Sequence, residues 1–180
     1  MKKLSVKQKN WLLSVHIAIA GIWFGTALIM VVIGLSNRNT TSGDALYAIN
    51  AILKQLDDFV IIPAAMGSLL TGALLCWLTI WGFVKHYWVI TKWVGTIALI
   101  LFGTFWLGPW TNAATSISEV ERLQALSNPL YMFDVKGMII GGAVTTLSLL
   151  TIIAISTLKP WGRRNTAKEN NVAKKITLTD

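Results

Sequence analysis

Long apolar stretches dominate the pattern of hydrophobic and polar positions along this chain. Four of them lack Asp, Glu, Lys and Arg, and each is long enough to cross a bilayer, which takes about 20 apolar residues per helix. Inside hydrocarbon every backbone polar group must be paired within its own segment, so these stretches are expected to be helices. The uncharged stretches are residues 11–35, 59–84, 93–110 and 137–158. The last two spans are expected to begin earlier, so the predicted spans are residues 11–35, 59–84, 87–110 and 132–158.

The segments between the spans are more polar. Residues 40–58 show a helical spacing of apolar positions, and residues 116–126 show a weaker one. Both are expected to be short helices that either lie on the outer membrane surface or extend a span. The last segment, residues 162–180, is polar and basic and is expected to be a disordered cytoplasmic tail. The predicted domain is therefore an all-α, integral membrane four-helix bundle over residues 1–161.

The composition agrees with this fold class and excludes an ordinary soluble enzyme. The chain of 180 residues is 54% hydrophobic and only 13% charged, whereas a soluble domain carries about 25% charged residues. Its net charge of +8 lies in short flanks beside the spans, a distribution that argues against nucleic-acid binding. A single Cys excludes an intramolecular disulfide.

The basic residues also predict an orientation. Twelve of the 16 Lys and Arg lie at the N-terminus, around the turn after residue 84 and in the tail, and the other four lie in the remaining two loops. Because basic loops stay in the cytoplasm, both termini and the middle turn are predicted there. The chain is thus expected to form an up-down bundle in a bacterial cytoplasmic membrane. The first span is too long for the apolar part of a signal peptide and is expected to be retained.

Two polar side chains within the spans are candidates for chemistry, because such groups are costly in hydrocarbon. His16 and Lys92 each lie about five residues into a span that starts at the cytoplasmic face, a depth of roughly 7 Å. A His and a Lys facing each other at one level could hold an anionic or metal-bearing ligand. Two structural interpretations stay open: His16 only packs between helices, and Lys92 extends toward the lipid headgroups.

Haem is a ligand that these residues could hold, although the same pattern is also typical of ordinary helix packing. Trp23 and several small residues follow His16 on one helical stripe and could line a flat ring. A neutral imidazole commonly holds haem iron, and cations pair with propionates. His86, the other His of the chain, is expected at the wet interface, so one haem with one His ligand is the most that the sequence supports. We therefore predict His16 as the metal ligand, with Trp23 and Lys92 as further haem-binding residues.

Acidic residues near the outer ends of the spans form a weaker candidate site. Asp57 and Asp58 precede the second span, and Asp134 and Lys136 open the fourth. They are expected to form an ion-pair cluster that aligns two helices, with a divalent-ion site as the alternative. The Met residues and Cys76 are too dispersed along the chain to predict a copper site.

Two Gly-x-x-x-Gly motifs, at residues 21–25 and 137–141, allow close approach of helices. They could serve packing within the bundle or a homo-oligomer.

Several short motifs resemble a known family. The string from His16 to Gly25, HIAIAGIWFG, resembles the first helix of the HemJ-type protoporphyrinogen oxidases, and residues 62–66 with Thr71-Gly72 are similar to their second helix. Lys92 resembles the essential Lys of their third helix, and residues 159–161 resemble their Lys-Pro-aromatic ending. The Arg and His that follow the first helix core in that family have no counterpart in residues 30–36.

The resemblance implies a b-type haem held by His16 and oxidation of a porphyrinogen. Electrons would then pass through the haem toward a quinone, and Lys92 would be the catalytic residue that contacts carboxylates. The His and Trp pattern is also similar to the CopD copper-resistance membrane domain, and residues 102–110 resemble a family of uncharacterised bacterial four-helix membrane proteins. The alternative functions are a non-enzymatic small membrane carrier or accessory subunit, and copper handling.

Overall fold

The structure, a computed structural model, describes residues 4–37, 39–79 and 82–161, and this part of the chain is helical. The tail predicted over residues 162–180 lies outside the described residues. The elements are α1 (Val6–Asn37), α2 (Gly43–Leu56), η1 (Asp57–Ile61), α3 (Ile62–Leu78), α4 (Tyr87–Phe102), η2 (Gly103–Leu107), α5 (Gly108–Glu121), η3 (Arg122–Ser127) and α6 (Pro129–Leu158).

Four helices in the described part are long and apolar enough to cross a membrane: Val6–Asn37, Gly43–Leu78, Tyr87–Ser127 and Pro129–Leu158. They contain 32, 36, 41 and 30 residues, which corresponds to lengths of roughly 45 to 60 Å. The hydrocarbon core of a bilayer is only about 30 Å thick. Each of these helices is therefore longer than a crossing of the hydrocarbon requires.

The helices differ from the predicted spans at several ends. Of the two arrangements expected for residues 40–58 and 116–126, the structure shows the one in which they extend a span, because α2 continues through η1 into α3, and α4 continues through η2 into α5. The helix expected to reach residue 84 ends at Leu78, where Thr79 has an extended backbone. Gly82, with φ of 64°, then takes a backbone conformation that favours glycine.

The two continuous helices α2–η1–α3 and α4–η2–α5 each contain one π-helical turn, η1 or η2. A proline follows two residues after the end of each turn. Pro63 follows η1, and Pro109 follows η2. A proline has no N–H to donate to the carbonyl four residues earlier, and its ring crowds that carbonyl. Widening the preceding turn to i→i−5 bonds, such as the one from Ile62 N–H to the Asp57 carbonyl, lets the helix continue without a break.

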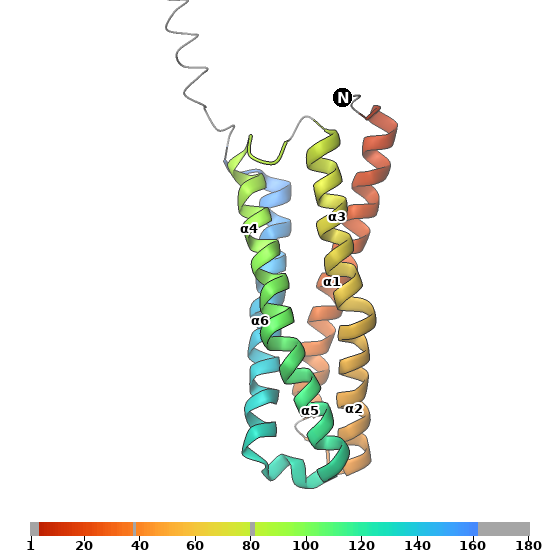
Figure 1. The fold of residues 1–180 in the computed structure, drawn as a ribbon, viewed down its shortest axis with the longest axis vertical. Coiled ribbons are helices and arrows are strands. Elements are labelled where there is room, and N and C mark those ends of the chain that lie inside the picture. The colour runs from red at the N-terminus through yellow and green to blue at the C-terminus, as the bar shows by residue number, and fades with distance from the viewer. Residues whose placement is uncertain (1–3, 38, 80–81, 162–180) are drawn as a thin grey trace, which may run out of the picture.

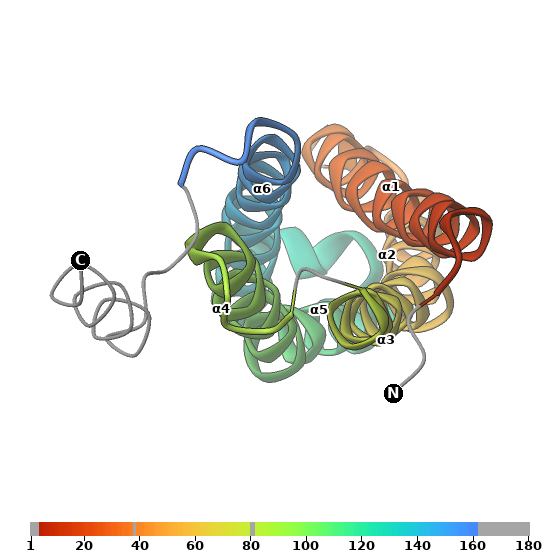
Figure 2. The same cartoon turned by 90° about the horizontal axis from the view of Figure 1, so that it is seen from above.

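The four long helices lie side by side in the bundle (Figure 1). The start of α1, the α3–α4 connection and the end of α6 lie at one end of the molecule, and α2, α5 and η3 form the other end (Figure 1). Seen from above, α1 and α3 lie on one side and α4 and α6 on the other (Figure 2). α1 packs on both α3 and α6, and α4 packs on α6. We call the end that carries α2, α5 and η3 the distal half and the opposite end the proximal half.

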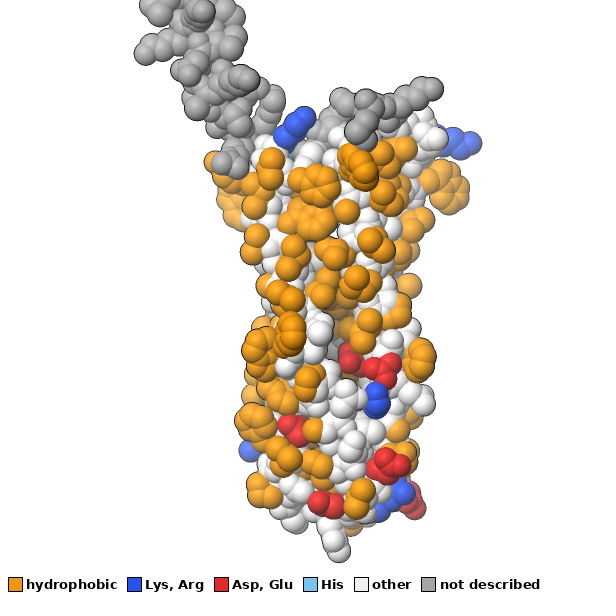
Figure 3. Space-filling model, in the orientation of Figure 1, with side chains coloured by type: hydrophobic (Ala, Val, Ile, Leu, Met, Phe, Trp, Pro, Cys, Tyr) orange, Lys and Arg blue, Asp and Glu red, His pale blue; other side chains and the backbone are white. Residues whose placement is uncertain are grey.

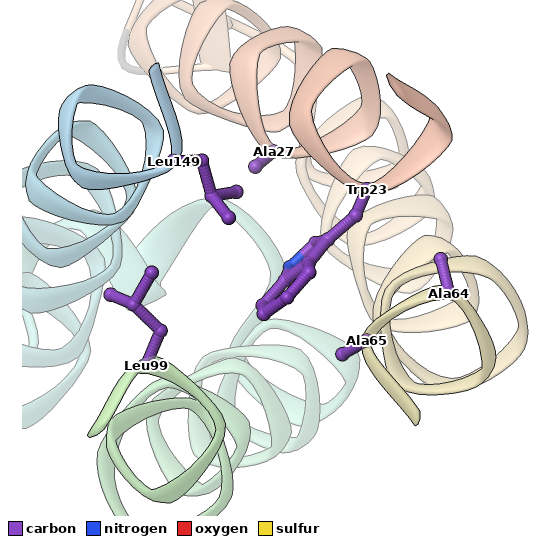
Figure 4. Packing of buried hydrophobic residues seen from close by; sticks show 6 residues of the cluster. All are labelled: Trp23, Ala27, Ala64, Ala65, Leu99 and Leu149. Atoms are coloured by element: carbon purple, nitrogen blue, oxygen red, sulfur yellow. The ribbon is translucent and has the colours of Figure 1, made fainter. Parts of the chain in front are cut away.

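The two halves have different interiors. In the proximal half a small apolar cluster fills the axis around Trp23 (Figure 4), and its members are Trp23, Ala27, Ala64, Ala65, Leu99 and Leu149. In the distal half a second cluster contains Leu46, Ala114, Ala125, Tyr131 and Val135. Next to it lies a buried polar network in which Asn50 donates to the hydroxyls of Ser118 and Tyr131, both at 3.0 Å.

The surface divides in the same way. In Figure 3 hydrophobic side chains cover most of the proximal half of the visible face, whereas the acidic side chains gather in the distal half. Many large apolar side chains on α1, α3, α4 and α6 are exposed, among them Ile22, Leu70, Val94 and Leu147. A soluble monomer rarely presents so large an apolar surface, so this surface is the one expected to face lipid.

The two Gly-x-x-x-Gly motifs have different surroundings. A Cβ at Gly137 would come within 2.8 Å of the Trp110 ring, and one at Gly141 would come within 2.7 Å of Leu107. This motif therefore serves close packing of α6 within the bundle. A Cβ at Gly21 or Gly25 would meet nothing within 4 Å, so the motif of α1 is not used inside the bundle.

Candidate functional site

His16 is held by α3 through a short hydrogen bond between its Nδ1 atom and Thr71 Oγ1, at 2.8 Å. The Thr71 hydroxyl itself donates to the Gly67 carbonyl at 2.7 Å. A hydroxyl has only one proton to donate, so the imidazole is the donor toward Thr71 in the arrangement in which Thr71 donates to Gly67. In that arrangement the proton of the neutral ring lies on Nδ1 and the lone pair on Nε2.

A glycine makes room for this contact. A Cβ at Gly72 would lie 3.4 Å from His16 Cε1, so a larger side chain there would press on the imidazole. The Thr71-Gly72 pair therefore both orients the ring and leaves space beside it.

Lys92 is held inside the bundle by α6. Its Nζ donates to Ser156 Oγ at 2.9 Å and lies 5.8 Å from the centre of the Trp88 ring. The Nζ of Lys159, at the end of α6, lies at the same distance from Trp88. The structure therefore places the Lys92 ammonium against the neighbouring helix and an aromatic face, in contrast to a lysine that extends freely toward the headgroups.

The predicted proximity of His16 and Lys92 agrees with the structure only in part. The charge of Lys92 acts on the His16 ring and on the Cys76 thiol, so the three side chains lie in one region of the proximal half. However, His16 is bonded to α3 and Lys92 to α6. Each is thus tied to its own neighbouring helix, and the two are not bonded to each other.

Trp23 lies two turns farther along α1 than His16, roughly 10 Å toward the distal half. Its side chain is 3% exposed and points between the helices toward Leu99, Leu149 and Ala65 (Figure 4). It therefore closes the region of His16 on the distal side, by packing in the apolar cluster.

The donor chemistry at His16 fits a haem ligand, because ligating imidazoles usually donate their second N–H to a nearby oxygen. A cavity beside Trp23 does not contribute to such a site. It has a volume of about 70 Å³ and is lined by Trp23 but by neither His16 nor Lys92, whereas pockets for larger ligands measure roughly 300–1,000 Å³. α3 and α4 pack on α1 and α6 rather than closely on each other.

The ion-pair cluster expected from the acidic residues does not form in the described part of the chain. Asp58 pairs with Lys54 of the preceding turn at 2.6 Å, and neither Asp57 nor Asp134 has an ion-pair partner among the described residues. Lys136 is exposed. Asp57 in η1 and Asp134 in α6 face the interior separately, because the direction of each side chain is set by the rotation of its own helix. The described residues also contain no group of three or more His, Cys, Asp and Glu that could hold a metal ion.

Sequence reasoning did not identify Ser156 and gave Thr71 no role in orienting His16. Both are hydroxyl residues in apolar spans, and a hydroxyl at the depth of a buried His or Lys on a neighbouring helix is the signal that points to them. His86 lies at the start of α4, beside the Trp88 ring, with 6.0 Å between ring centres.

No family model, curated protein or solved structure matches this chain.

Proposed function

We propose that this protein is a multi-pass protein of a bacterial cytoplasmic membrane that binds one b-type haem through His16 and has a redox or porphyrin-handling role. The observation that carries the proposal is the Nδ1 bond of His16 to Thr71, because it orients the ring and directs the lone pair to Nε2. The likeness of residues 16–25 to the first helix of HemJ-type oxidases supports the same ligand.

Each residue of the region then has a role. Haem, when bound, supplies one-electron redox chemistry at its iron. His16 would hold the iron, and Thr71 would keep the imidazole in the ligating tautomer. The ammonium of Lys92 would exchange its bond to Ser156 for a stronger one to a carboxylate, either of a haem propionate or of a porphyrinogen. In the oxidase, electrons would continue to a quinone.

The proposed membrane orientation has both termini in the cytoplasm and the distal half outside. It is supported by the concentration of Lys and Arg at the N-terminus, near residues 85–92 and after Leu158, and by the acidic side chains of the distal half. With Tyr87 at the cytoplasmic boundary, about 30 Å of hydrocarbon reaches roughly to Leu107. The π-helical turn η2 would then lie at the outer membrane boundary.

An absorption spectrum of purified protein from cells grown with haem tests the proposal. We expect a Soret band in the wild type, its loss in His16→Ala, and its retention in His86→Ala, which is a matched control at the membrane boundary. An unchanged band in His16→Ala would reject the ligand assignment.

A second candidate is a non-enzymatic carrier or accessory subunit. The observation that favours it is the cavity near Trp23, which is separate from His16. A wild-type protein without a Soret band, even after addition of haem, would favour this function over haem binding.

A further inference from the structure

The cavity of about 70 Å³ lies on the distal side of Trp23, between α1, the α2–η1 region, the η2–α5 region and α6. Most of its wall is apolar, and its polar side chains are Asp57, Thr111 and Thr145. One water needs about 10–15 Å³ of such space. The cavity therefore has room for a small ion with a few waters, but not for a larger organic ligand.

The two π-helical turns shape the polar side of this cavity. Asp57 is the first residue of η1, and Leu107 is the last residue of η2; both line the cavity. A Cβ on Gly108 would lie 3.9 Å from Asp57 Oδ2, so the carboxylate lies beside the backbone that leaves η2. The next residue, Asp58, is instead bonded to Lys54 at 2.6 Å.

The Asp57 carboxylate has no hydrogen-bond or ion-pair partner in the described part of the chain. Lys54, the ammonium closest to it along α2, is already bonded to Asp58. A carboxylate in an apolar wall is costly unless a counter-charge accompanies it. The cavity wall thus carries one negative charge that no side chain bonds.

Thr145 is the second feature that points to a ligand. It is 5% exposed, it lines the cavity, and its Oγ1 atom is buried without a hydrogen-bond partner among the described residues. The neighbouring Thr146 instead donates to the Gly142 carbonyl at 2.8 Å, the usual solution for a helical threonine. The hydroxyl of Thr145 therefore remains available to a guest of the cavity.

A third unpaired oxygen lies one turn beyond the cavity. Asp134 is 3% exposed, and its Oδ2 atom is buried without a partner in the described structure. It lies four residues before Met138, which lines the cavity. A second carboxylate oxygen without a partner therefore lies on α6 near the cavity, outside its wall.

We infer that this cavity binds a monovalent cation, with Asp57 as its charged ligand and the Thr145 hydroxyl as a neutral ligand. One carboxylate in an apolar wall matches a single positive charge, whereas divalent cations take more oxygen ligands and commonly several carboxylates. Sodium is the expected ion because the space holds a small ion with part of its hydration. The site does not involve His16, so it stands or falls independently of haem binding.

Equilibrium binding of radioactive sodium to the full chain in detergent, with choline chloride to keep ionic strength constant, tests the inference. We expect saturable sodium binding in the wild type and about a tenfold or greater loss of affinity in Asp57→Asn and in Thr145→Val. Thr146→Val is the matched control for Thr145→Val, one residue away on the same helix, and should bind as the wild type does. Potassium competition measures the preference between the two ions.

The outcomes are distinct. Absence of saturable sodium or potassium binding in the wild type overturns the inference, as does full binding in Asp57→Asn. If Asp57→Asn does not fold, as judged by its elution profile and helical circular dichroism, Thr145→Val decides, because it keeps the shape of the side chain. His16→Ala should leave sodium binding unchanged, so a failed haem assignment and a failed cation site are separable.

Discussion

Replacing Asn50 with leucine is the sharpest test of how the distal half is held together. Asn50 is 1% exposed. Its Nδ2 donates to Ser118 Oγ and Tyr131 OH at 3.0 Å each, and its Oδ1 accepts from Asn37 Nδ2 at 3.3 Å. These bonds link α2 to α1, α5 and α6 at one point. Leucine has a similar size but can form none of them.

The magnitude follows from the bonds that are lost. Three hydrogen bonds at about 1 kcal/mol each, with a further penalty of about 1–3 kcal/mol for the Asn37 amide left buried and unpaired, predict a loss of about 4–6 kcal/mol in the free energy of unfolding. Tyr131→Phe should cost only about 1 kcal/mol, because Asn50 keeps its bond to Ser118.

Unfolding of the purified protein by denaturing detergent, followed by circular dichroism, measures both effects. Gln55→Leu, at an exposed position of the same helix, is the control for added hydrophobicity. The variant that combines Asn50→Leu with Tyr131→Phe should be no less stable than Asn50→Leu alone, because the bond between Asn50 and Tyr131 is already absent in Asn50→Leu. The reasoning is refuted if Asn50→Leu is as stable as the wild type, or if Tyr131→Phe costs the same in both backgrounds.

Three further predictions follow from the site and the orientation. Lys92→Arg and Lys92→Met should both express normally and both weaken haem retention or turnover, because a bulkier guanidinium and an uncharged stem each lose the confined ammonium; a wild-type spectrum and activity in the arginine variant would show that Lys92 has no role in the site. Thr71→Val should lower haem affinity by about 10–100-fold through loss of the acceptor for the imidazole, as measured by haem titration, whereas Thr151→Val on the exposed face of α6 should not. Reporter fusions after Arg164 should be active only with a cytoplasmic reporter, and those within Thr40 to Asp44 only with an external one; an external signal at the C-terminus would contradict the proposed orientation.

Local pattern was sufficient for the helical part of the fold. Four uncharged apolar stretches predicted helices that could cross a membrane, and the described residues contain four such helices. The ends were less accurate, because the boundary of an apolar stretch marks where lipid contact is expected to stop, and a helix can continue beyond it. The prolines at 63 and 109 were visible in the sequence, but their consequence, a π-helical turn instead of a break, depends on how the neighbouring helices hold the chain.

For the candidate residues, too, the sequence indicated part of the site and the tertiary structure decided the rest. The sequence by itself singled out His16 and Lys92, because a polar side chain in an apolar stretch is conspicuous, and it gave them similar depths by counting. Only the tertiary structure decided that His16 is bonded to Thr71 and Lys92 to Ser156, and that Asp57 and Thr145 line one cavity. His16 and Thr71 are 55 residues apart in the sequence, and Lys92 and Ser156 are 64 residues apart. The rotation of each helix about its axis determines which of them meet, and that rotation is fixed by the packing of all the helices together.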